Sequence, residues 1–284
     1  MPHPLAHVNI YREAAELNRR DPLLTGSLLR FPDYGQLVMT GDLHGHQRNL
    51  DRLQNYCDLE HAPARHVILH ELIHADLETL VSIDQSHLVL LQAARWKCEF
   101  PDQVHFIQGN HELSQLTNHE ISKGGRIVTQ NFIQGIEASY DHAADEVYAA
   151  ILDFIASLPL AARTANRIFL SHSLPGHRDM PRFDPGIFDH PVNELDLTER
   201  GSVYPLVWGR YQTEAVLQTL ADLLDVDIFV CGHQPQENGY EVRHDRMIII
   251  ASDHSHGVFI PFDLGKRYTA ADLVRLMRPL ASIA

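Results

Sequence analysis

Short apolar runs alternate with amphipathic helical stretches along most of this chain. Apolar residues in unbroken runs predict buried strands, whereas a spacing of three and four predicts helices with one buried face. Strands are expected in this way at 37–40, 65–69, 104–108, 167–170 and 227–230. An antiparallel pair at 240–243 and 247–251 and a last strand at 257–262 follow them.

The helical pattern recurs between these strands. Helices are expected at 11–20, 47–58, 84–97, 145–157 and 214–224, whereas the polar residues 117–129 predict a loop with a short helix. Strands that alternate with helices are typical of an α/β domain, in which ligands gather at the carboxyl ends of strands.

One segment, 175–203, interrupts the alternation. It carries four prolines and many charges, and we expect a long surface loop or cap there. The chain has 284 residues and shows no internal repeat or low-complexity tract. We therefore expect a single domain over residues 1–284, with its core at about 36–262.

Composition narrows the classes of function. The formal net charge of −14 disfavours binding to nucleic acid backbones. The three cysteines form no CxxC pair, which indicates reduced thiols. Neither a secretory signal nor a run long enough to span a membrane is visible. We expect a cytoplasmic protein without a membrane or nucleic acid partner, and its oligomeric state stays open.

Potential metal ligands directly follow five of the predicted strands. In chain order they are Asp42 and His44, Glu71, Asn110, His172, and His233. Turns favour Asp, Asn, Ser and Gly at the ends of strands. They do not require a carboxylate, an amide or an imidazole after all five of these strands. This mixture suits Mn, Fe or Zn better than Ca or Mg. Two such ions about 3.5–4 Å apart share a bridging carboxylate and generate a hydroxide at neutral pH.

The motifs around these residues resemble those of the calcineurin-like metallophosphoesterases, and most of all the phosphoprotein (serine/threonine) phosphatase branch. The matching pieces are Gly41–Gly45, Gly109–Glu112, Leu158–Ala162 with Ile168–His172, Trp208–Arg210, and Gly232–Gln234 with Gly239–Glu241. They occur in family order from about residue 36 to residue 260. The resemblance implies a four-layer sandwich of mixed β-sheets flanked by helices, with metals at the strand carboxyl ends.

The resemblance also implies roles for the motif residues. The ligands of the first metal would be Asp42 and His44, those of the second would be Asn110, His172 and His233, and Glu71 stands where the family has its bridging aspartate. Two divalent transition-metal ions are implied, with Mn favoured over Fe, Zn, Ni and Co. His111 would protonate the leaving group. Arg210 would clamp the phosphate, because a guanidinium holds two phosphoryl oxygens at once.

The second family motif, Gly-Asp-x-x-Asp-Arg-Gly, is rewritten here. Glu71 is longer than aspartate by one methylene, about 1.5 Å of reach. His74 replaces the aspartate that orients the catalytic histidine, and a neutral imidazole cannot stabilise a protonated His111 as a carboxylate does. Ala75 replaces the arginine that grips phosphate.

The residues leave several alternatives open. His70 or His74 could supply an extra ligand, as could Asp253, His254 and His256 after a later strand. His70 to His74 also resembles the His-Glu-x-x-His of zinc peptidases, although a strand rather than a helix is expected before it.

The expected function is that of a metallophosphatase, a hydrolase of phosphoric ester bonds. It would cleave a phosphomonoester, in a phosphopeptide or a small phosphoester, by attack of a metal-bridging hydroxide. The alternatives are a dinucleoside polyphosphate hydrolase or phosphodiesterase of the same superfamily, and a weakly active or non-enzymatic metal-binding relative.

Overall fold

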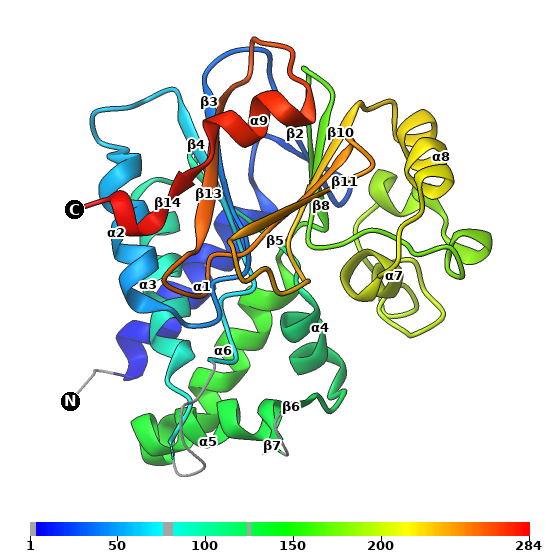
Figure 1. Ribbon diagram of the computed structural model, residues 1–284. Coiled ribbons are helices and arrows are strands. Elements are labelled where there is room, and N and C mark those ends of the chain that lie inside the picture. Colours follow the sequence, from blue (N-terminus) through cyan, green and yellow to red (C-terminus); the bar gives the residue numbers. More distant parts are fainter. Residues whose placement is uncertain (1–3, 76–81, 124–125) are drawn as a thin grey trace.

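Two mixed β-sheets packed face to face form the centre of the computed structural model, which describes residues 4–75, 82–123 and 126–284 (Figure 1). The five-stranded sheet has the order β14-β13-β3-β4-β5. Its strands are β3 (Gln36–Thr40), β4 (Arg65–His70), β5 (Val104–Ile107), β13 (Val258–Asp263) and β14 (Arg278–Pro279). The central strands β3, β4 and β5 are parallel, whereas β13 runs antiparallel to β3.

The seven-stranded sheet has the order β1-β2-β8-β9-β10-β12-β11. Its strands are β1 (Leu24–Thr25), β2 (Leu28–Phe31), β8 (Ala161–Thr164), β9 (Ile168–Ser171), β10 (Ile228–Cys231), β11 (Tyr240–Arg243) and β12 (Met247–Ile250). Strands β9, β10 and β12 are parallel, and β11 pairs antiparallel with β12, which confirms the expected pair.

Side chains alternate between two apolar layers along each central strand. In β3, Leu37 and Met39 belong to the core between the sheets, whereas Val38 faces the helices outside. In β9, Leu170 points between the sheets and Phe169 points outward. This period of two residues explains why the strands read as continuous apolar runs, because both faces of each sheet are covered.

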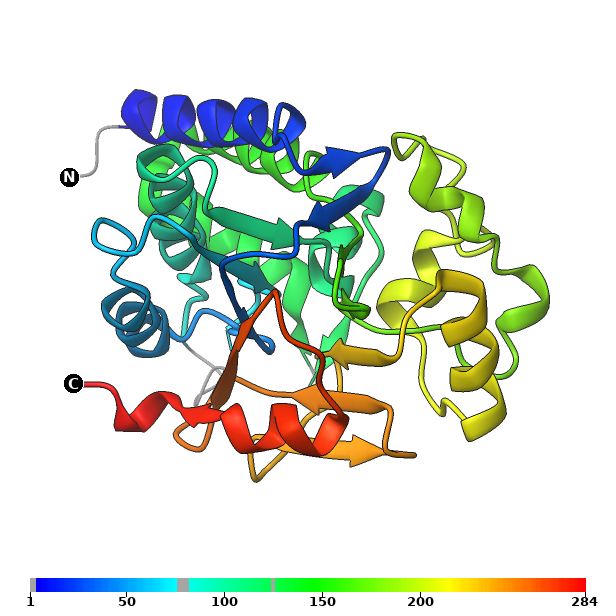
Figure 2. The same ribbon diagram turned by 90° about the horizontal axis from the view of Figure 1, so that it is seen from above.

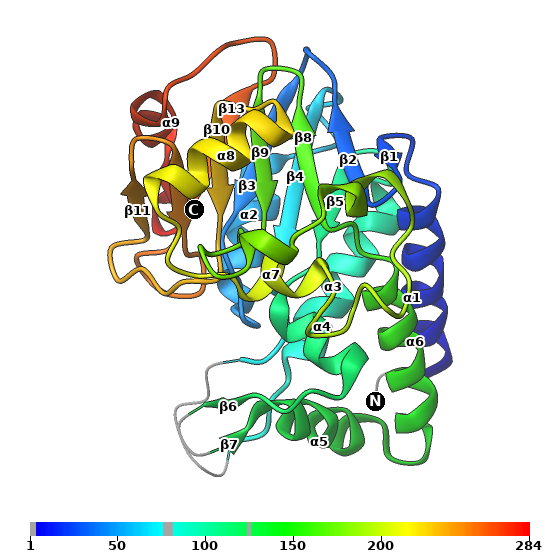
Figure 3. The same ribbon diagram turned by 90° about the vertical axis from the view of Figure 1, so that its right-hand side faces the viewer.

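Helices complete the four layers, as Figures 2 and 3 show. The outer face of the five-stranded sheet is covered by α1 (Pro4–Arg19), α2 (Gln47–Cys57), α3 (Ser86–Glu99) and α6 (Ala144–Ala156). The seven-stranded sheet is covered by α7 (Val203–Trp208) and α8 (Glu214–Leu224). The remaining helices are α4 (Asn110–Thr117), α5 (Val128–Tyr140) and α9 (Ala270–Leu276). None of the helices in the described ranges is long and apolar enough to cross a bilayer.

The structure corrects the expected elements in places. The first helix begins at Pro4 rather than at residue 11. The stretch 117–129, of which 124–125 lie outside the described residues, holds β6 (Ser122–Lys123), β7 (Arg126–Ile127) and the start of α5 instead of a loop. The segment 175–203 contains two 3₁₀ turns, η2 (Met180–Arg182) and η3 (Pro185–Asp189), and packs Ile187 and Phe188 into the outer core.

The two sheets meet at the strand ends that carry the candidate ligands. A parallel bridge joins Asp42, just beyond β3, to Ala251, just beyond β12. The close approach depends on Gly41, because a Cβ at that position would lie 2.1 Å from the Ile250 carbonyl oxygen. Side chains that follow β3, β4 and β5 are thereby brought opposite those that follow β9 and β10.

Candidate metal centre

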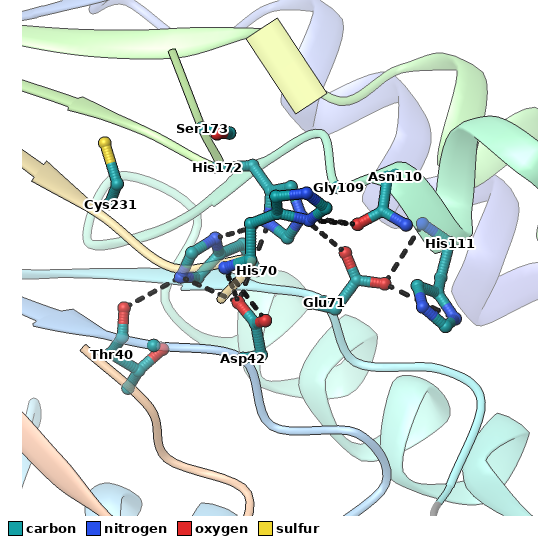
Figure 4. A network of polar contacts seen from close by, with 12 residues as sticks. Thr40, Asp42, His70, Glu71, Gly109, Asn110, His111, His172, Ser173 and Cys231 are labelled. Carbon is teal, nitrogen blue, oxygen red and sulfur yellow. Dashed lines mark hydrogen bonds and ion pairs between the residues drawn. The ribbon is translucent and has the colours of Figure 1, made fainter. Parts of the chain in front are cut away.

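Ligand-type side chains lie side by side where the two sheets meet, and Figure 4 shows Asn110, His172 and Glu71 among them. Asn110 Oδ1 lies 2.7 Å from His172 Nε2 and 2.9 Å from His233 Nδ1. Glu71 Oε2 lies 3.2 Å from the same His172 nitrogen. Ligands held about 2.0–2.2 Å from one ion lie about 3 Å apart, so this spacing fits a single cation.

Glu71 Oε2 supplies a second indication that the cluster suits a cation. This oxygen is buried and has no hydrogen-bond partner among the described residues, whereas Oε1 accepts a hydrogen bond from the His111 backbone N–H at 3.1 Å. Buried carboxylate oxygens are rarely left without a partner. A metal ion bound beside Asn110 and His172 would satisfy it.

His70 orients His172 for such a role. The His70 Nε2 lies 2.9 Å from the Thr40 carbonyl oxygen, which can only accept, so this nitrogen carries the proton (Figure 4). The His70 Nδ1 is therefore an acceptor, and it lies 3.3 Å from His172 Nδ1. Metal-binding histidines donate their outer N–H in this way, which leaves the other nitrogen to the metal. His172 thus turns its Nε2 lone pair toward Asn110 and Glu71.

The expected ligands of the first metal, Asp42 and His44, fall into two different groups. The Asp42 carboxylate accepts the His233 backbone N–H at 2.9 and 3.0 Å and is grouped with His70 and His172. His44 Nδ1 lies 3.0 Å from the Ile73 carbonyl oxygen, and the ring is grouped with Glu71 and His111.

The backbone at the site is held in an uncommon conformation. His44, Glu71, His74 and His233 have φ angles of 41°, 49°, 61° and 67°, in the left-handed region. This region costs about 1–2 kcal/mol for each non-glycine residue, and such strain is concentrated at functional sites. At Glu71 it turns a side chain that follows a strand toward α4.

Burial shifts the pKa of each group in the direction that disfavours charge. It raises the pKa of Asp42 and Glu112, and raises that of Glu71 well above its usual range with further help from Glu112. It lowers the pKa of His233 to about 3 and that of His172 well below its usual range. A divalent cation lowers the pKa of the carboxylates that bind it and so reverses the effect of burial. These acids and neutral imidazoles therefore form a donor set that suits a divalent cation.

The remaining candidates take other positions. Arg210 is exposed and donates from Nε to His233 Nε2 at 3.2 Å. In this arrangement the neutral His233 ring carries its proton on Nδ1 and donates it to Asn110 Oδ1, so a metal ion on His233 Nδ1 would require the contact with Arg210 to break. His254 and His256 contact the carbonyl oxygens of Gln236 and Glu237 and join neither group of potential ligands found among the described residues. Ala75 stands where the second family motif has its phosphate-binding arginine.

The peptidase alternative is wrong. A His-Glu-x-x-His zinc site needs both histidines on one face of a helix. Here His70 ends β4 and His74 lies in the irregular segment after it. Their rings face different partners, His172 and His111.

Sequence reasoning missed two polar residues of α4. Glu112 Oε1 accepts the Leu72 backbone N–H at 2.9 Å, and its Oε2 is buried without a hydrogen-bond partner in the described chain. Gln115 donates to His74 Nε2 at 2.7 Å. The signal for Gln115 was its position four residues after His111, which places both on one side of the helix.

The protein has two stacked sheets, and acids, an amide and imidazoles lie at the strand ends where the sheets meet. This combination of fold and site defines the metallophosphoesterase class of proteins. The chain matches the family model of the calcineurin-like phosphoesterases over residues 36–237, and it belongs to this family. The resemblance of the motifs to this family is thereby confirmed.

Particular relatives agree with this assignment. A probable serine/threonine-protein phosphatase of Encephalitozoon cuniculi is 23% identical over 170 residues, which cover 54% of this chain and 34% of that protein. The chain thus spans about a third of the length of this curated relative.

Solved structures share the fold. A serine/threonine phosphatase of Saccharomyces cerevisiae superposes with a TM-score of 0.68 at 14% identity, covering 99% of this chain and 94% of that one. A cold-active protein-tyrosine phosphatase of a Shewanella species gives 0.57 at 16% identity, covering 90% and 84%. At these identities the likeness shows the fold alone, and it confirms the expected four-layer α/β architecture.

Proposed function

We propose that this protein is a metal-dependent phosphatase that hydrolyses a phosphomonoester. The observation that carries the proposal is that Asn110 Oδ1 lies 2.7 Å from His172 Nε2 and 2.9 Å from His233 Nδ1, while Glu71 Oε2 lies 3.2 Å from the same His172 nitrogen. Family membership supports the reaction class, and the orphaned Glu71 oxygen supports the metal requirement.

In this proposal Asn110, His172 and His233 would hold one ion, Asp42 and His44 would contribute to a second, and Glu71 would serve both. Two divalent ions, for which Mn is our choice, would activate the attacking water and neutralise the phosphoryl oxygens. The chain's own part is to position the carboxylates and to keep the imidazoles neutral in a buried site, whereas bound cations would keep the carboxylates charged.

Two further side chains would act on the phosphoryl group. His111 follows Asn110 at the start of α4, and its backbone N–H already fixes Glu71. We assign it to the leaving-group oxygen. Arg210 takes the phosphate clamp in place of the arginine lost at Ala75, because its guanidinium is exposed beside His233.

We assign the peptide part of a phosphopeptide to a cavity of about 540 Å³ between α4 and residues 194–208, which none of the candidate ligands lines. Trp208 lines it, and the Trp208 ring meets the His233 ring at a centroid distance of 6.0 Å. Tyr204 stacks on Trp208, and Glu194 and Glu199 supply negative charge to the lining. Aromatic faces with carboxylates favour a basic side chain, so we propose substrates with Arg or Lys near the phosphorylated residue.

Turnover of p-nitrophenyl phosphate by protein loaded with Mn tests the proposal. We expect hydrolysis that a chelator abolishes and added Mn restores. His172→Ala should reduce the rate by at least about 10³-fold, whereas His256→Ala, at an exposed histidine outside the cluster, should not change it. No turnover with Mn, Ni, Co, Fe or Zn would refute the phosphatase activity.

A further inference from the structure

Four arginines line a cavity of about 430 Å³ at the end of the seven-stranded sheet that is remote from the metal centre. Arg30 lies on β2, Arg163 is its register partner on β8, Arg167 lies in the turn between β8 and β9, and Arg267 follows β13. Arg167 precedes β9, whereas the candidate ligand His172 follows it. Figure 3 shows this turn at the end of the sheet away from α4. The cavity is therefore separate from the candidate metal centre.

Two aspartates hold three of these guanidinium groups in place. Asp225 accepts hydrogen bonds from Arg163 at 2.6 Å and from Arg167. Asp227 accepts them from Arg167 at 3.0 Å and from Arg267 at 2.8 Å. The Asp227 backbone N–H also donates to the Arg167 carbonyl oxygen at 2.8 Å, which ties the start of β10 to the turn before β9. Because the guanidinium groups are already ordered, a ligand that binds them loses less free energy to the ordering of side chains.

The same arginines keep hydrogen-bond donors for a ligand. Arg30 donates no side-chain hydrogen bond within the described ranges, and the Asp189 carboxylate that pairs with it lies 4.0 Å away. Arg163, Arg167 and Arg267 each use at most two of their three side-chain nitrogens in hydrogen bonds to described residues. Exposed ion pairs of this kind contribute little to stability, so an incoming carboxylate can compete for these groups.

An apolar hollow of about 250 Å³ continues the arginine cavity. The two share Arg30, Arg163 and Asp225 in their linings. The large apolar residues that line the hollow are Leu28, Phe169, Phe188, Leu223 and Leu224. Pockets for whole small molecules measure about 300–1,000 Å³, so the hollow suits a single apolar side chain that belongs to a longer ligand.

We propose that the two cavities form a docking site for an acidic peptide segment of a partner protein. Carboxylates of the segment would bind the arginines, and an apolar side chain next to them would fill the hollow. An inorganic anion would leave the hollow empty, and a long nucleic acid would be repelled by the net charge of −14. A short acidic segment is attracted locally, because salt screens charges more than about 8 Å apart at physiological ionic strength. This inference goes beyond the proposed phosphatase function and does not depend on it.

Calorimetric titration of the full chain with a synthetic peptide tests the site. The peptide carries two glutamates on each side of one leucine, and its ends are acetylated and amidated. We expect saturable binding that is at least about fivefold weaker at high than at low ionic strength, because salt screens exposed charges. Arg30→Gln should weaken binding at least about fivefold. Arg12→Gln is the matched control, because Arg12 is an exposed arginine on α1 whose partner is Glu146 at 3.6 Å, and it should leave the affinity unchanged.

A second peptide, with glycine in place of the leucine, tests the apolar hollow. We expect it to bind the wild type at least about fivefold more weakly than the leucine peptide does. Leu223→Ser should weaken binding of the leucine peptide and leave that of the glycine peptide unchanged. The Leu223 side chain is 49% exposed, so this change is compatible with folding.

The outcomes separate the possible occupants. No binding of the leucine peptide, or equal affinity in Arg30→Gln and the wild type, overturns the proposal. Equal affinity for the two peptides, or displacement of the leucine peptide by an equal concentration of inorganic phosphate, shows a site for anions alone and also overturns it. Tighter binding of a single-stranded oligonucleotide that Arg30→Gln abolishes would assign the site to nucleic acid instead. Peptide binding should be the same with Mn or with a chelator, so absence of phosphatase turnover leaves this inference intact.

Discussion

The Glu71 carboxylate packs against the backbone of Gly109 so closely that a Cβ at Gly109 would lie 2.0 Å from Glu71 Oε2. The same Cβ would lie 2.4 Å from Glu112 Oε2. The glycine that begins α4 therefore makes room for the two buried carboxylates. It explains how a glutamate, longer than the expected aspartate, fits among the ligand atoms of Asn110 and His172.

Replacement of Gly109 should accordingly abolish the metal centre. We expect Gly109→Ala to displace Glu71 and to weaken metal binding by at least about tenfold, measured by calorimetric titration with Mn. Gly186→Ala provides a control outside the cluster, because its Cβ would meet only the Asp184 side chain at 3.1 Å or more. Equal metal affinity in Gly109→Ala and the wild type would show that Glu71 does not ligate.

Loss of the His70 acceptor should weaken the metal site without removing a ligand. His70→Ala deletes the group that fixes the His172 ring through its Nδ1, and such outer partners contribute 10–100-fold in affinity. The absorption spectrum of a Co-loaded sample should keep its general form at this lower affinity. A spectrum that lost one nitrogen ligand would instead identify His70 as a direct ligand.

Metal binding should strengthen as the pH rises from 5 to 7. Burial raises the pKa of Glu71 and Asp42, so both hold protons above the usual carboxyl range in the metal-free protein. A metal ion must displace these protons. Titrations in buffers of different ionisation enthalpy should show net proton release when the metal binds. Proton uptake on binding would contradict the assigned directions.

His87 should make the protein less stable in mild acid. The ring is fully buried against Phe132 and Tyr140, and neither nitrogen has a hydrogen-bond partner in the described part of the chain. Burial lowers the pKa of His87 to about 4 from its ordinary 6.5. The unfolded chain therefore binds a proton at His87 more tightly than the folded chain does. As the pH falls from 6.5 toward 4, the free energy of unfolding decreases.

Replacement of His87 by an apolar residue tests this assignment. When the pH falls from 7 to 5, protonation of His87 in the unfolded chain should lower the free energy of unfolding by about 2 kcal/mol. His87→Leu should remove that part of the pH dependence in urea unfolding. An unchanged slope between pH 7 and pH 5 would contradict the low pKa.

The sequence patterns predicted the central strands because each of these strands is apolar on both faces. They did not predict β1 and β2 at one edge of the seven-stranded sheet, the adjoining β8, or the full length of α5 in place of the loop and short helix expected at 117–129. Short edge strands carry little periodicity, and polar stretches such as that before α5 depend on tertiary packing.

The contacts around the rewritten motif lay beyond sequence reasoning for a different reason. The residues of the second motif depart from the family pattern, but the partners of His70 and His74 come from remote segments. His172 is about 100 positions from His70 along the chain, and Gln115 contacts His74 from α4. Left-handed backbone at Glu71 and His74 aims these side chains, and no pattern of apolar residues encodes it.

The central claim is that Glu71, Asn110, His172 and His233 bind one metal ion. A crystal structure of Mn-loaded protein, with the ions located by anomalous scattering, tests it most directly. We predict an anomalous peak about 2.0–2.3 Å from Asn110 Oδ1, His172 Nε2, His233 Nδ1 and a Glu71 carboxylate oxygen. A loaded crystal with no peak among these four atoms, or with its peaks only elsewhere, would contradict the claim.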